Sequence, residues 1–295
     1  MKTTTRAALG AVLPLLLALT ACGETTTEYV TTTEYVTVTG PAGTYIVDDL
    51  SGTTPSVVGK STFQLRVRTK ATGAAATGLA ASLRPVMYMP TYNHGAPADV
   101  VTESATTPGT YDCAVYYQMA SGPSMGFWEV SATIGTERVA FYPTVDMPMG
   151  TDSILVRLWG VSDVGMGGMS STKYVIFRDG PLTAAAGSLK LYLSRSENMM
   201  MDFKPVYVGS TLAAPTGAVT SVTLTASADA AFTTPLPAVH GANGHWSVDV
   251  SSLGLAAGTQ ATVYLKLKVN GEDKTTDGLV VSATNAAVAF KSTPQ

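Results

Sequence analysis

Residues 62–70 read TFQLRVRTK and residues 261–269 read ATVYLKLKV. Both stretches alternate apolar and polar side chains with a period of two. In the first, Phe63, Leu65 and Val67 fall on one side of an extended chain, and the intervening polar residues fall on the other. This alternation is typical of a β-strand with one buried face. These two stretches decide the fold class, because the sequence between and around them repeats the same pattern.

Similar strands are expected in FWEVSATIG (127–135), DSILVRLWG (152–160), KYVIFRDG (173–180), SLKLYLSR (188–195) and VTLTASA (222–228). They recur about every ten residues between turns rich in Gly, Pro and Asn, and Asn270-Gly271 predicts a tight hairpin. No stretch has convincing helical periodicity. The sequence therefore predicts an all-β protein of antiparallel β-sandwiches.

Alternation pauses in PLTAAAG (181–187) and restarts at GSLKLYLSR, whose opening is similar to GKSTFQLRVRT (59–69). This pause is interpreted as a linker. The expected domains are one sandwich over 44–182 and a second over 183–295.

The N-terminus reads as a targeting signal. Lys2 and Arg6 precede an apolar run that ends in LTAC at residues 19–22, and this arrangement resembles a bacterial lipoprotein signal. The resemblance implies that residues 1–21 are removed and that Cys22 carries a lipid that anchors the protein outside the cytoplasm. Gly23 after the cysteine implies the outer membrane, if the source has two membranes. The repeated TTTEYV motif then predicts a disordered Thr-rich tether within residues 22–43.

Composition limits the partners and the stabilising devices. The net charge is −3 and charged residues make up 13% of the chain, which argues against nucleic acid as a partner. Apart from Cys22 the chain has one cysteine, Cys113, so no intramolecular disulfide is expected and the thiol is interpreted as a small buried side chain.

Methionine carries the strongest chemical signal. Met87 and Met89 are two positions apart on an expected strand, so their thioethers face one side, and Met147 and Met149 repeat this spacing in a loop. His94 follows closely. Thioethers together with an imidazole favour Cu(I) over harder cations. These five residues are the predicted metal ligands, and the alternative is that the methionines fill the core or loops.

Residues 63–135 also resemble the YtkA-like or FixH-like periplasmic module. The similar features are FQLRVRT, MYMPTYNHG at 87–95, the PG-x-Y at 108–111, and FWEV at 127–130 after a methionine. The resemblance implies an immunoglobulin-like sandwich and a link to metal transport or respiratory-oxidase assembly. Tyr92 stands where a further methionine often precedes the histidine, so the resemblance does not fix the ligands.

Enzymatic motifs are missing from the sequence, which lacks G-x-S-x-G, H-E-x-x-H and a phosphate-binding loop, so no enzyme is predicted. His240 and His245 are interpreted as loop histidines. The first functional hypothesis is a lipid-anchored binding protein that handles copper or another soft metal, with a periplasmic or envelope protein as a partner. The alternative is a structural or adhesive surface lipoprotein that binds a protein or a glycan and no metal, with aromatic residues as core or as contact surface.

Overall fold

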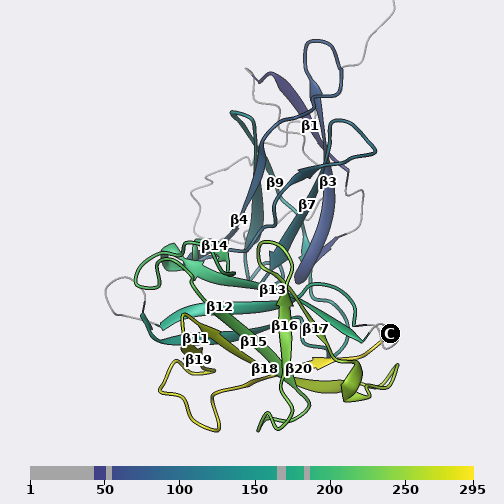
Figure 1. Ribbon diagram of the computed structural model, residues 1–295. Helices are drawn as coiled ribbons and strands as arrows, with labels where there is room; N and C mark the ends of the chain where they lie inside the picture. The colour runs from purple at the N-terminus through teal and green to yellow at the C-terminus, as the bar shows by residue number, and fades with distance from the viewer. Residues whose placement is uncertain (1–42, 51–54, 165–170, 183–186) are drawn as a thin grey trace, which may run out of the picture. The chain divides into compact units, whose positions relative to one another are not determined.

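The computed structural model describes residues 43–50, 55–164, 171–182 and 187–295. Its regular secondary structure is almost wholly strand (Figure 1), which confirms the expected all-β class with antiparallel sheets. The predicted signal peptide, Cys22 and the tether lie outside these residues. Within the described ranges, no helix is long and apolar enough to cross a membrane.

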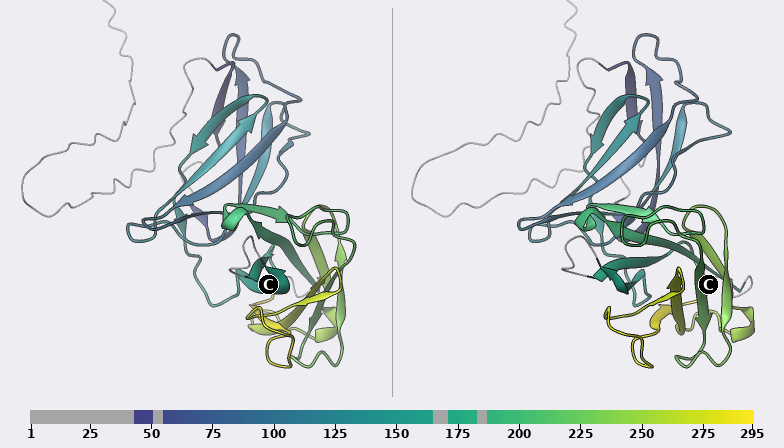
Figure 2. Two further views of the ribbon diagram at one scale, coloured as in Figure 1. Left: turned by 90° about the vertical axis from the view of Figure 1, so that its left-hand side faces the viewer. Right: turned by 60° about the vertical axis from the view of Figure 1, so that its left-hand side comes forward.

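The first sandwich has two sheets of four strands each (Figure 2). One sheet has the order β1 (Tyr45–Asp49), β3 (Gly59–Thr69), β7 (Thr110–Tyr117), β6 (Thr102–Glu103). The other has the order β5 (Asn93–Gly95), β4 (Ala81–Tyr88), β8 (Phe127–Ile134), β9 (Glu137–Phe141). The short strands β2 (Ser56–Val57) and β10 (Val145–Asp146) form a separate parallel pair. When the strands of the two large sheets are lettered in chain order, the sheets read A-B-E-D and C′-C-F-G, the order of an immunoglobulin-like sandwich.

The core of this sandwich follows from the alternation in the sequence. Leu65 and Val67 of β3 are fully buried in one cluster, and Trp128 of β8 is fully buried in a second cluster, where it packs with Val115 and Tyr117 of the facing sheet. Cys113 is buried on β7, and burial raises the pKa of its thiol to about 12. The thiol is therefore protonated and unreactive at neutral pH, as expected for a side chain that serves packing.

The second half forms one sheet of ten strands. Its strands are β11 (Leu155–Val164), β12 (Ser171–Arg178), β13 (Ser188–Glu197), β14 (Asp202–Pro205), β15 (Val222–Ser227), β16 (Leu236–His240), β17 (His245–Asp249), β18 (Ala261–Val269), β19 (Glu272–Lys274) and β20 (Val288–Ser292). Two short 3-10 helices, η2 (Asn198–Met200) and η3 (Ser251–Leu253), interrupt them. The expected hairpin at Asn270-Gly271 joins β18 to β19, and both residues have positive φ, 52° and 80°.

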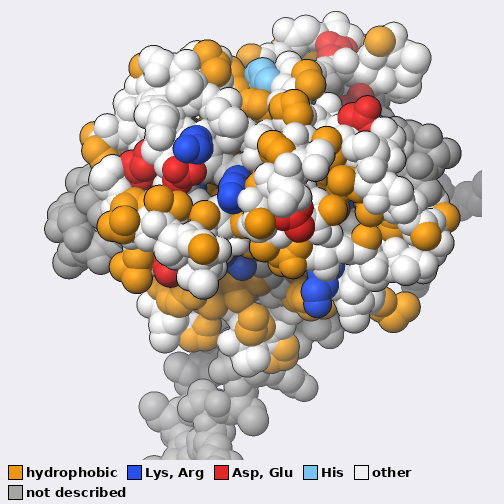
Figure 3. Space-filling view, turned by 60° about the horizontal axis from the view of Figure 1, so that its bottom comes forward, with side chains coloured by type: hydrophobic (Ala, Val, Ile, Leu, Met, Phe, Trp, Pro, Cys, Tyr) orange, Lys and Arg blue, Asp and Glu red, His pale blue; other side chains and the backbone are white. Residues whose placement is uncertain are grey.

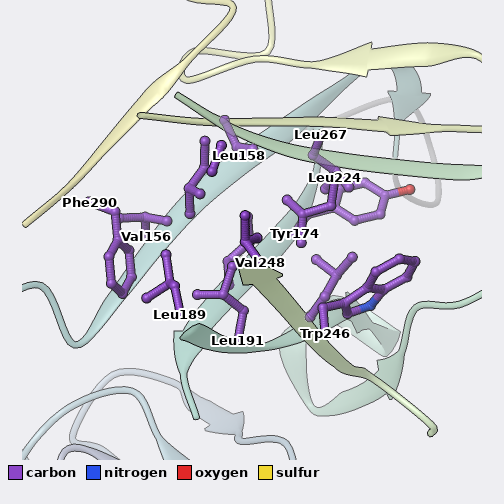
Figure 4. Packing of buried hydrophobic residues seen from close by; sticks show 14 of the residues in the cluster. Val156, Leu158, Tyr174, Leu189, Leu191, Leu224, Trp246, Val248, Leu267 and Phe290 are labelled. Carbon is purple, nitrogen blue, oxygen red and sulfur yellow. The ribbon is translucent and has the colours of Figure 1, made fainter. Parts of the chain in front are cut away.

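This sheet folds over a single core (Figure 4). Strand β16 pairs with β15 on one side and with β17 on the other, so it carries the sheet from one layer to the next. Leu224 and Leu267 from β15 and β18 face Leu191 and Trp246 from β13 and β17 across the core. The layers thus enclose their apolar side chains as two packed sheets would.

The sheets change at a different point from the expected boundary at residues 182–183. β11 pairs with β12, and β12, which precedes the expected boundary, pairs with β13, which follows it. The strands on either side of the expected boundary therefore belong to one sheet, and the change from the first sandwich to the second sheet falls between Asp146 and Leu155. A linker and a hairpin connection both interrupt the alternation, so the sequence pattern does not distinguish them.

The surface carries few charges. In Figure 3, which looks onto the end at the bottom of Figure 1, acidic and basic side chains are scattered among apolar and uncharged polar ones. This agrees with the low charged fraction of 13%. Association with a partner is therefore expected to depend on shape and apolar contact more than on long-range electrostatic attraction.

Candidate functional site

The predicted metal ligands do not converge in the structure. Met87 is fully buried in the core of the first sandwich, and Met89 packs partly buried against the same cluster. Met147 and Met149, in contrast, are 62% and 102% exposed. The buried Met87 and the exposed Met147 and Met149 therefore do not share one environment.

His94 has a soft partner that the sequence analysis did not include. Its Nε2 atom lies 3.0 Å from the Sδ atom of Met119, in the segment after β7. The ring meets that of Trp128 edge-on at 5.3 Å, and the Trp128 indole N–H donates to the Met119 carbonyl at 3.0 Å. Trp128 thus supports both members of the pair.

The protonation of His94 follows from its other nitrogen. Nδ1 lies 2.9 Å from the carbonyl oxygen of Gly95, which can only accept, so Nδ1 carries the proton. Burial lowers the pKa of His94, with further lowering from the charges of Lys173 and Arg157. The ring is therefore neutral, and the lone pair of Nε2 points at the Met119 sulfur.

The pair of His94 and Met119 is not part of a larger group of His, Cys, Asp or Glu ligands among the described residues. Among the residues that the structure describes, no three His, Cys, Asp or Glu side chains gather as ligands for a metal ion. A metal at His94 would therefore depend on soft donors. The two nearby cations oppose any bound positive charge, which favours a monovalent over a divalent ion.

A second feature is an exposed row of rings on the outer side of the sheet β5-β4-β8-β9. We call Tyr88, Phe127 and Tyr142 the aromatic face. Tyr88 of β4 is paired with Phe127 of β8, and their rings stack with centroids 5.3 Å apart. The centroid of the Tyr142 ring lies 6.1 Å from that of Phe127. Phe127 is 46% exposed and Tyr142 is 56% exposed. Tyr88 and Phe127 lie on the outer side because they alternate along β4 and β8 with the buried Met87 and Trp128, and Tyr142 follows β9 directly.

Polar and apolar neighbours extend the aromatic face. The Tyr142 hydroxyl donates to Glu129 at 3.3 Å, and Arg138 forms an ion pair with Glu129 at 3.0 Å. Tyr92 and Met125, from the loops next to β4 and β8, are also exposed. The result is an exposed aromatic surface with the Arg138–Glu129 ion pair beside it.

A third feature joins the two halves of the unit Thr33–Gln295. We call Lys60, Asp99, Tyr116, Asp179 and His245 the junction cluster. His245 Nδ1 lies 2.7 Å from Asp179, and its Nε2 lies 2.8 Å from Asp99. The other oxygen of Asp179 accepts from Lys60 at 2.7 Å and from Tyr116 at 2.6 Å. The Tyr116 ring stacks on Tyr192 at 4.1 Å.

Titration in the junction cluster follows from these contacts. The hydrogen bonds that the His245 ring donates to Asp179 and Asp99 raise the pKa of His245 to about 9. Burial alone would raise the pKa of Asp179, but hydrogen bonds from His245, Lys60 and Tyr116 outweigh it and lower that pKa to about 2. Both groups are therefore charged at neutral pH. Both ring nitrogens of His245 are engaged by carboxylates, which makes this cluster an ionic lock between the two halves.

Sequence reasoning missed the partners of both histidines. His245 is interpreted from sequence as a loop residue, whereas it begins β17 and bonds to residues far away in the chain. Met119 and His94 are 25 positions apart in the chain, so the alternation within a single strand does not relate them. Tyr142 could have been found, since it follows the alternating stretch of β9 by one residue.

No known protein family matches this chain, and no curated protein matches it in sequence. Among solved structures, the chain is similar to the Escherichia coli adhesin FdeC, with 12% identity, a TM-score of 0.26 and coverage of 88% of this chain. It is also similar to invasin, described as a bacterial integrin-binding protein, with 11% identity, a TM-score of 0.24 and coverage of 85%. A titin fragment matches with 9% identity and a TM-score of 0.18, over 81% of this chain and 90% of its own. The chain spans 65% of the adhesin chain and 40% of the invasin chain. At these scores the similarities assign neither a partner nor an activity.

Proposed function

We propose that this protein is a lipid-anchored, extracytoplasmic surface protein that acts by binding a partner protein through the aromatic face. The observation that carries the proposal is the exposure of Phe127 and Tyr142, at 46% and 56%, in a continuous row with Tyr88. The anchor is Cys22, as the lipoprotein-like signal implies. This proposal replaces the five-ligand copper site as the main hypothesis, because the structure separates those ligands.

The composition of the aromatic face supports a protein as the partner. The cores of protein interfaces are enriched in Tyr, Phe, Met and Arg, and truncation of such anchors usually causes the largest losses of affinity. Here two tyrosines and a phenylalanine lie beside Arg138, with the exposed Met125 nearby. The rings already contact one another, so little side-chain entropy is lost on binding.

The experiment compares cells that display the full-length protein with cells that display a Phe127→Ser, Tyr142→Ser variant. Both are tested against immobilised extracellular proteins and against a glycan array. We expect saturable binding to a protein that the double substitution abolishes. A Val239→Ser variant is the control, because Val239 is a similarly exposed apolar residue, at 66%, on β16 in the second half.

Two outcomes contradict the proposal. Binding that survives the double substitution would place the contact elsewhere, and binding confined to glycans would replace the protein partner with a carbohydrate. An antibody to an added tag measures the amount of each of the three forms on the cell surface. Equal amounts show that a difference in binding is not a difference in expression.

A second candidate function is Cu(I) binding at His94 and Met119. The observation that favours it is the 3.0 Å approach of two lone-pair donors, His94 Nε2 and Met119 Sδ. In a trigonal or linear Cu(I) site, bonds of about 2.1 Å to nitrogen and about 2.3 Å to sulfur would place these atoms about 3.8–4.4 Å apart, so the two side chains would separate by about 1 Å to admit an ion. Both donors are soft enough to prefer Cu(I), and the partly buried Met89 packs in the same cluster.

Anaerobic titration of the unit Thr33–Gln295 with Cu(I) against a competing chelator tests this candidate. We expect one ion per chain, with affinity that falls in a Met119→Leu variant, since leucine keeps the volume and removes the sulfur. A Met147→Leu, Met149→Leu variant is the matched control. Equal affinity in the Met119 and control variants, or no binding beyond the chelator, would exclude the site.

A further inference from the structure

The second half buries an unusual number of charges at one edge of its core. Arg195, Asp163 and Lys274 have side chains that are 2%, 4% and 1% exposed, and Glu197 beside Arg195 is 7% exposed. Lys274 Nζ lies 3.6 Å from Asp163 Oδ2 and 3.1 Å from Glu272 Oε1. Removing so many charges from water is costly, so the arrangement calls for a reason beyond packing.

The backbone is shaped to bring Asp163 to Lys274. The register of β11 shifts between Trp159 and Val164, which marks a bulge, and bulges commonly re-aim a side chain. A Cβ atom at Gly160 would lie 2.5 Å from the Cβ of Asp163, so only glycine fits there. Lys274 ends β19, and the next residue, Thr275, exchanges two backbone hydrogen bonds with Trp159, at 2.7 and 2.9 Å.

We infer that Lys274 and Asp163 are joined by an intramolecular amide bond between Nζ and the side-chain carboxyl carbon Cγ. The bond links β11 to β19, the two strands at opposite ends of the sheet order, where they meet at Trp159 and Thr275. It is formed by the protein's own side chains after folding.

The neighbouring groups provide the chemistry of the step. Glu272 Oε1, held in place by the backbone N–H of Val161 at 2.7 Å, takes a proton from the Lys274 ammonium. The free amine then attacks Cγ of Asp163. Arg195 donates to Oδ1 at 2.9 Å and stabilises the negative charge that develops on this oxygen, which remains as the amide carbonyl.

The leaving oxygen is Oδ2, which accepts a hydrogen bond from Tyr174 and is the oxygen nearest to Lys274. The proton on Glu272 and a second proton from the amine go to this oxygen, which departs as water. The ammonium and the carboxylate thus become one amide and one water, and no oxidant or other reagent is needed. A pocket of about 180 Å³, lined by Asp163, Glu272 and Lys274, can receive the water.

The surroundings favour the product over the ion pair. A buried pair held at contact distance has a high effective concentration, which offsets the unfavourable equilibrium of amide formation in water. The bond also removes one positive and one negative charge from a dry site, while Arg195 keeps Glu197 as its partner at 3.1 Å. The Lys274 ammonium also lies over the Tyr174 ring, 4.9 Å from its centroid, which holds it beside Asp163.

The test is intact-mass analysis of the denatured, purified unit Thr33–Gln295. We expect a mass lower than that of the sequence by about 18 Da, the mass of one water. Tryptic digestion of the full-length protein should show no cleavage after Lys274, and a branched peptide that joins residues 158–173 to residues 269–291. A Lys274→Arg variant should recover the full mass and lose the branched peptide.

Two further measurements keep the result unambiguous. Glu272→Gln retains the shape of the side chain but cannot accept the proton, so we expect the full mass in a protein that still folds by circular dichroism. Lys268 and Asp273, 3.0 Å apart but 49% and 26% exposed, are the internal control and should remain unlinked. A wild-type mass equal to that of the sequence, with normal cleavage after Lys274, would overturn the inference and leave a cluster of ion pairs.

Discussion

His245 Nδ1 lies 2.7 Å from Asp179 Oδ2, and this contact fixes the first strand residue of β17 to the connection that follows β12. Because Asp179 also accepts from Lys60 in the first sandwich, the carboxylate links the two halves through side chains of opposite charge. The lock therefore depends on the protonation of His245.

Stability is expected to fall at high pH. The pKa of His245 is raised from 6.5 to about 9, so its contribution is complete below pH 6.5 and is lost as the pH rises through 9. The contribution of Asp179, whose pKa is lowered to about 2, is present above its ordinary value of 3.8 and is lost as the pH falls through 2. We expect the loss at high pH to be on the order of 2 kcal/mol, since solvent partly screens the ring.

The measurement is thermal unfolding of the wild type and of His245→Gln between pH 6 and 10. The difference in melting temperature between them should shrink as the pH rises. His240→Gln is the control, because that ring bonds to the Asn243 carbonyl of its own loop. A difference that stays constant across this range would rule out His245 as the titrating group.

The methionines should separate into two classes when substituted. Met87→Ala removes a fully buried side chain, and we expect a loss of about 2–5 kcal/mol in the free energy of unfolding. Met149→Ala acts on a fully exposed side chain and should change it by less than about 0.5 kcal/mol. Urea denaturation followed by tryptophan fluorescence measures both. Similar effects at the two positions would show that the burial assigned to Met87 is wrong.

Glycine at position 126 is expected to be indispensable. Its φ is +117°, and a Cβ atom would lie 2.0 Å from the backbone oxygen of Tyr88. Gly126→Ala should therefore destabilise the protein by about 1–3 kcal/mol and disturb the aromatic face. Gly150, with φ +109° and open space around it, provides the matched control, because Gly150→Ala meets conformational strain without the clash. Equal losses in the two variants would show that the contact with Tyr88 has no effect.

The lipid anchor gives a prediction for the cell. A Cys22→Ser variant lacks the thiol that acylation requires, so we expect it to incorporate no labelled fatty acid and to leave the detergent phase on partitioning. Wild-type protein without label, or with a mature N-terminus other than Cys22, would refute the anchor.

Alternation was sufficient to find the strands whose two faces differ most. β3, β8 and β18 each bury mainly one side, so the period of two is visible in the residues themselves. The boundary between the halves was not visible, because β11 and β12 show the same alternation whichever sheet they join. Pairing depends on contacts with distant strands, which a local pattern does not contain.

The candidate site illustrates the same limit. Met87, in β4, and Met89, just after the end of β4, both pack against the core of the first sandwich. The soft partner of His94 is Met119, however, and the partners of His245 are Asp99 and Asp179. These pairs form because the fold brings separate segments together, and their spacing in the chain carries no signal.

The backbone pairing of Trp159 with Thr275 has a consequence for self-association. Unpaired sheet edges present free N–H and C=O groups that recruit strands from other molecules and begin aggregation. In the second half, the strands at the two ends of the sheet order satisfy each other at this point through backbone bonds of 2.7 and 2.9 Å. Substitutions that remove these backbone bonds, such as Thr275→Pro, should expose both strand edges and increase self-association as the protein concentration rises.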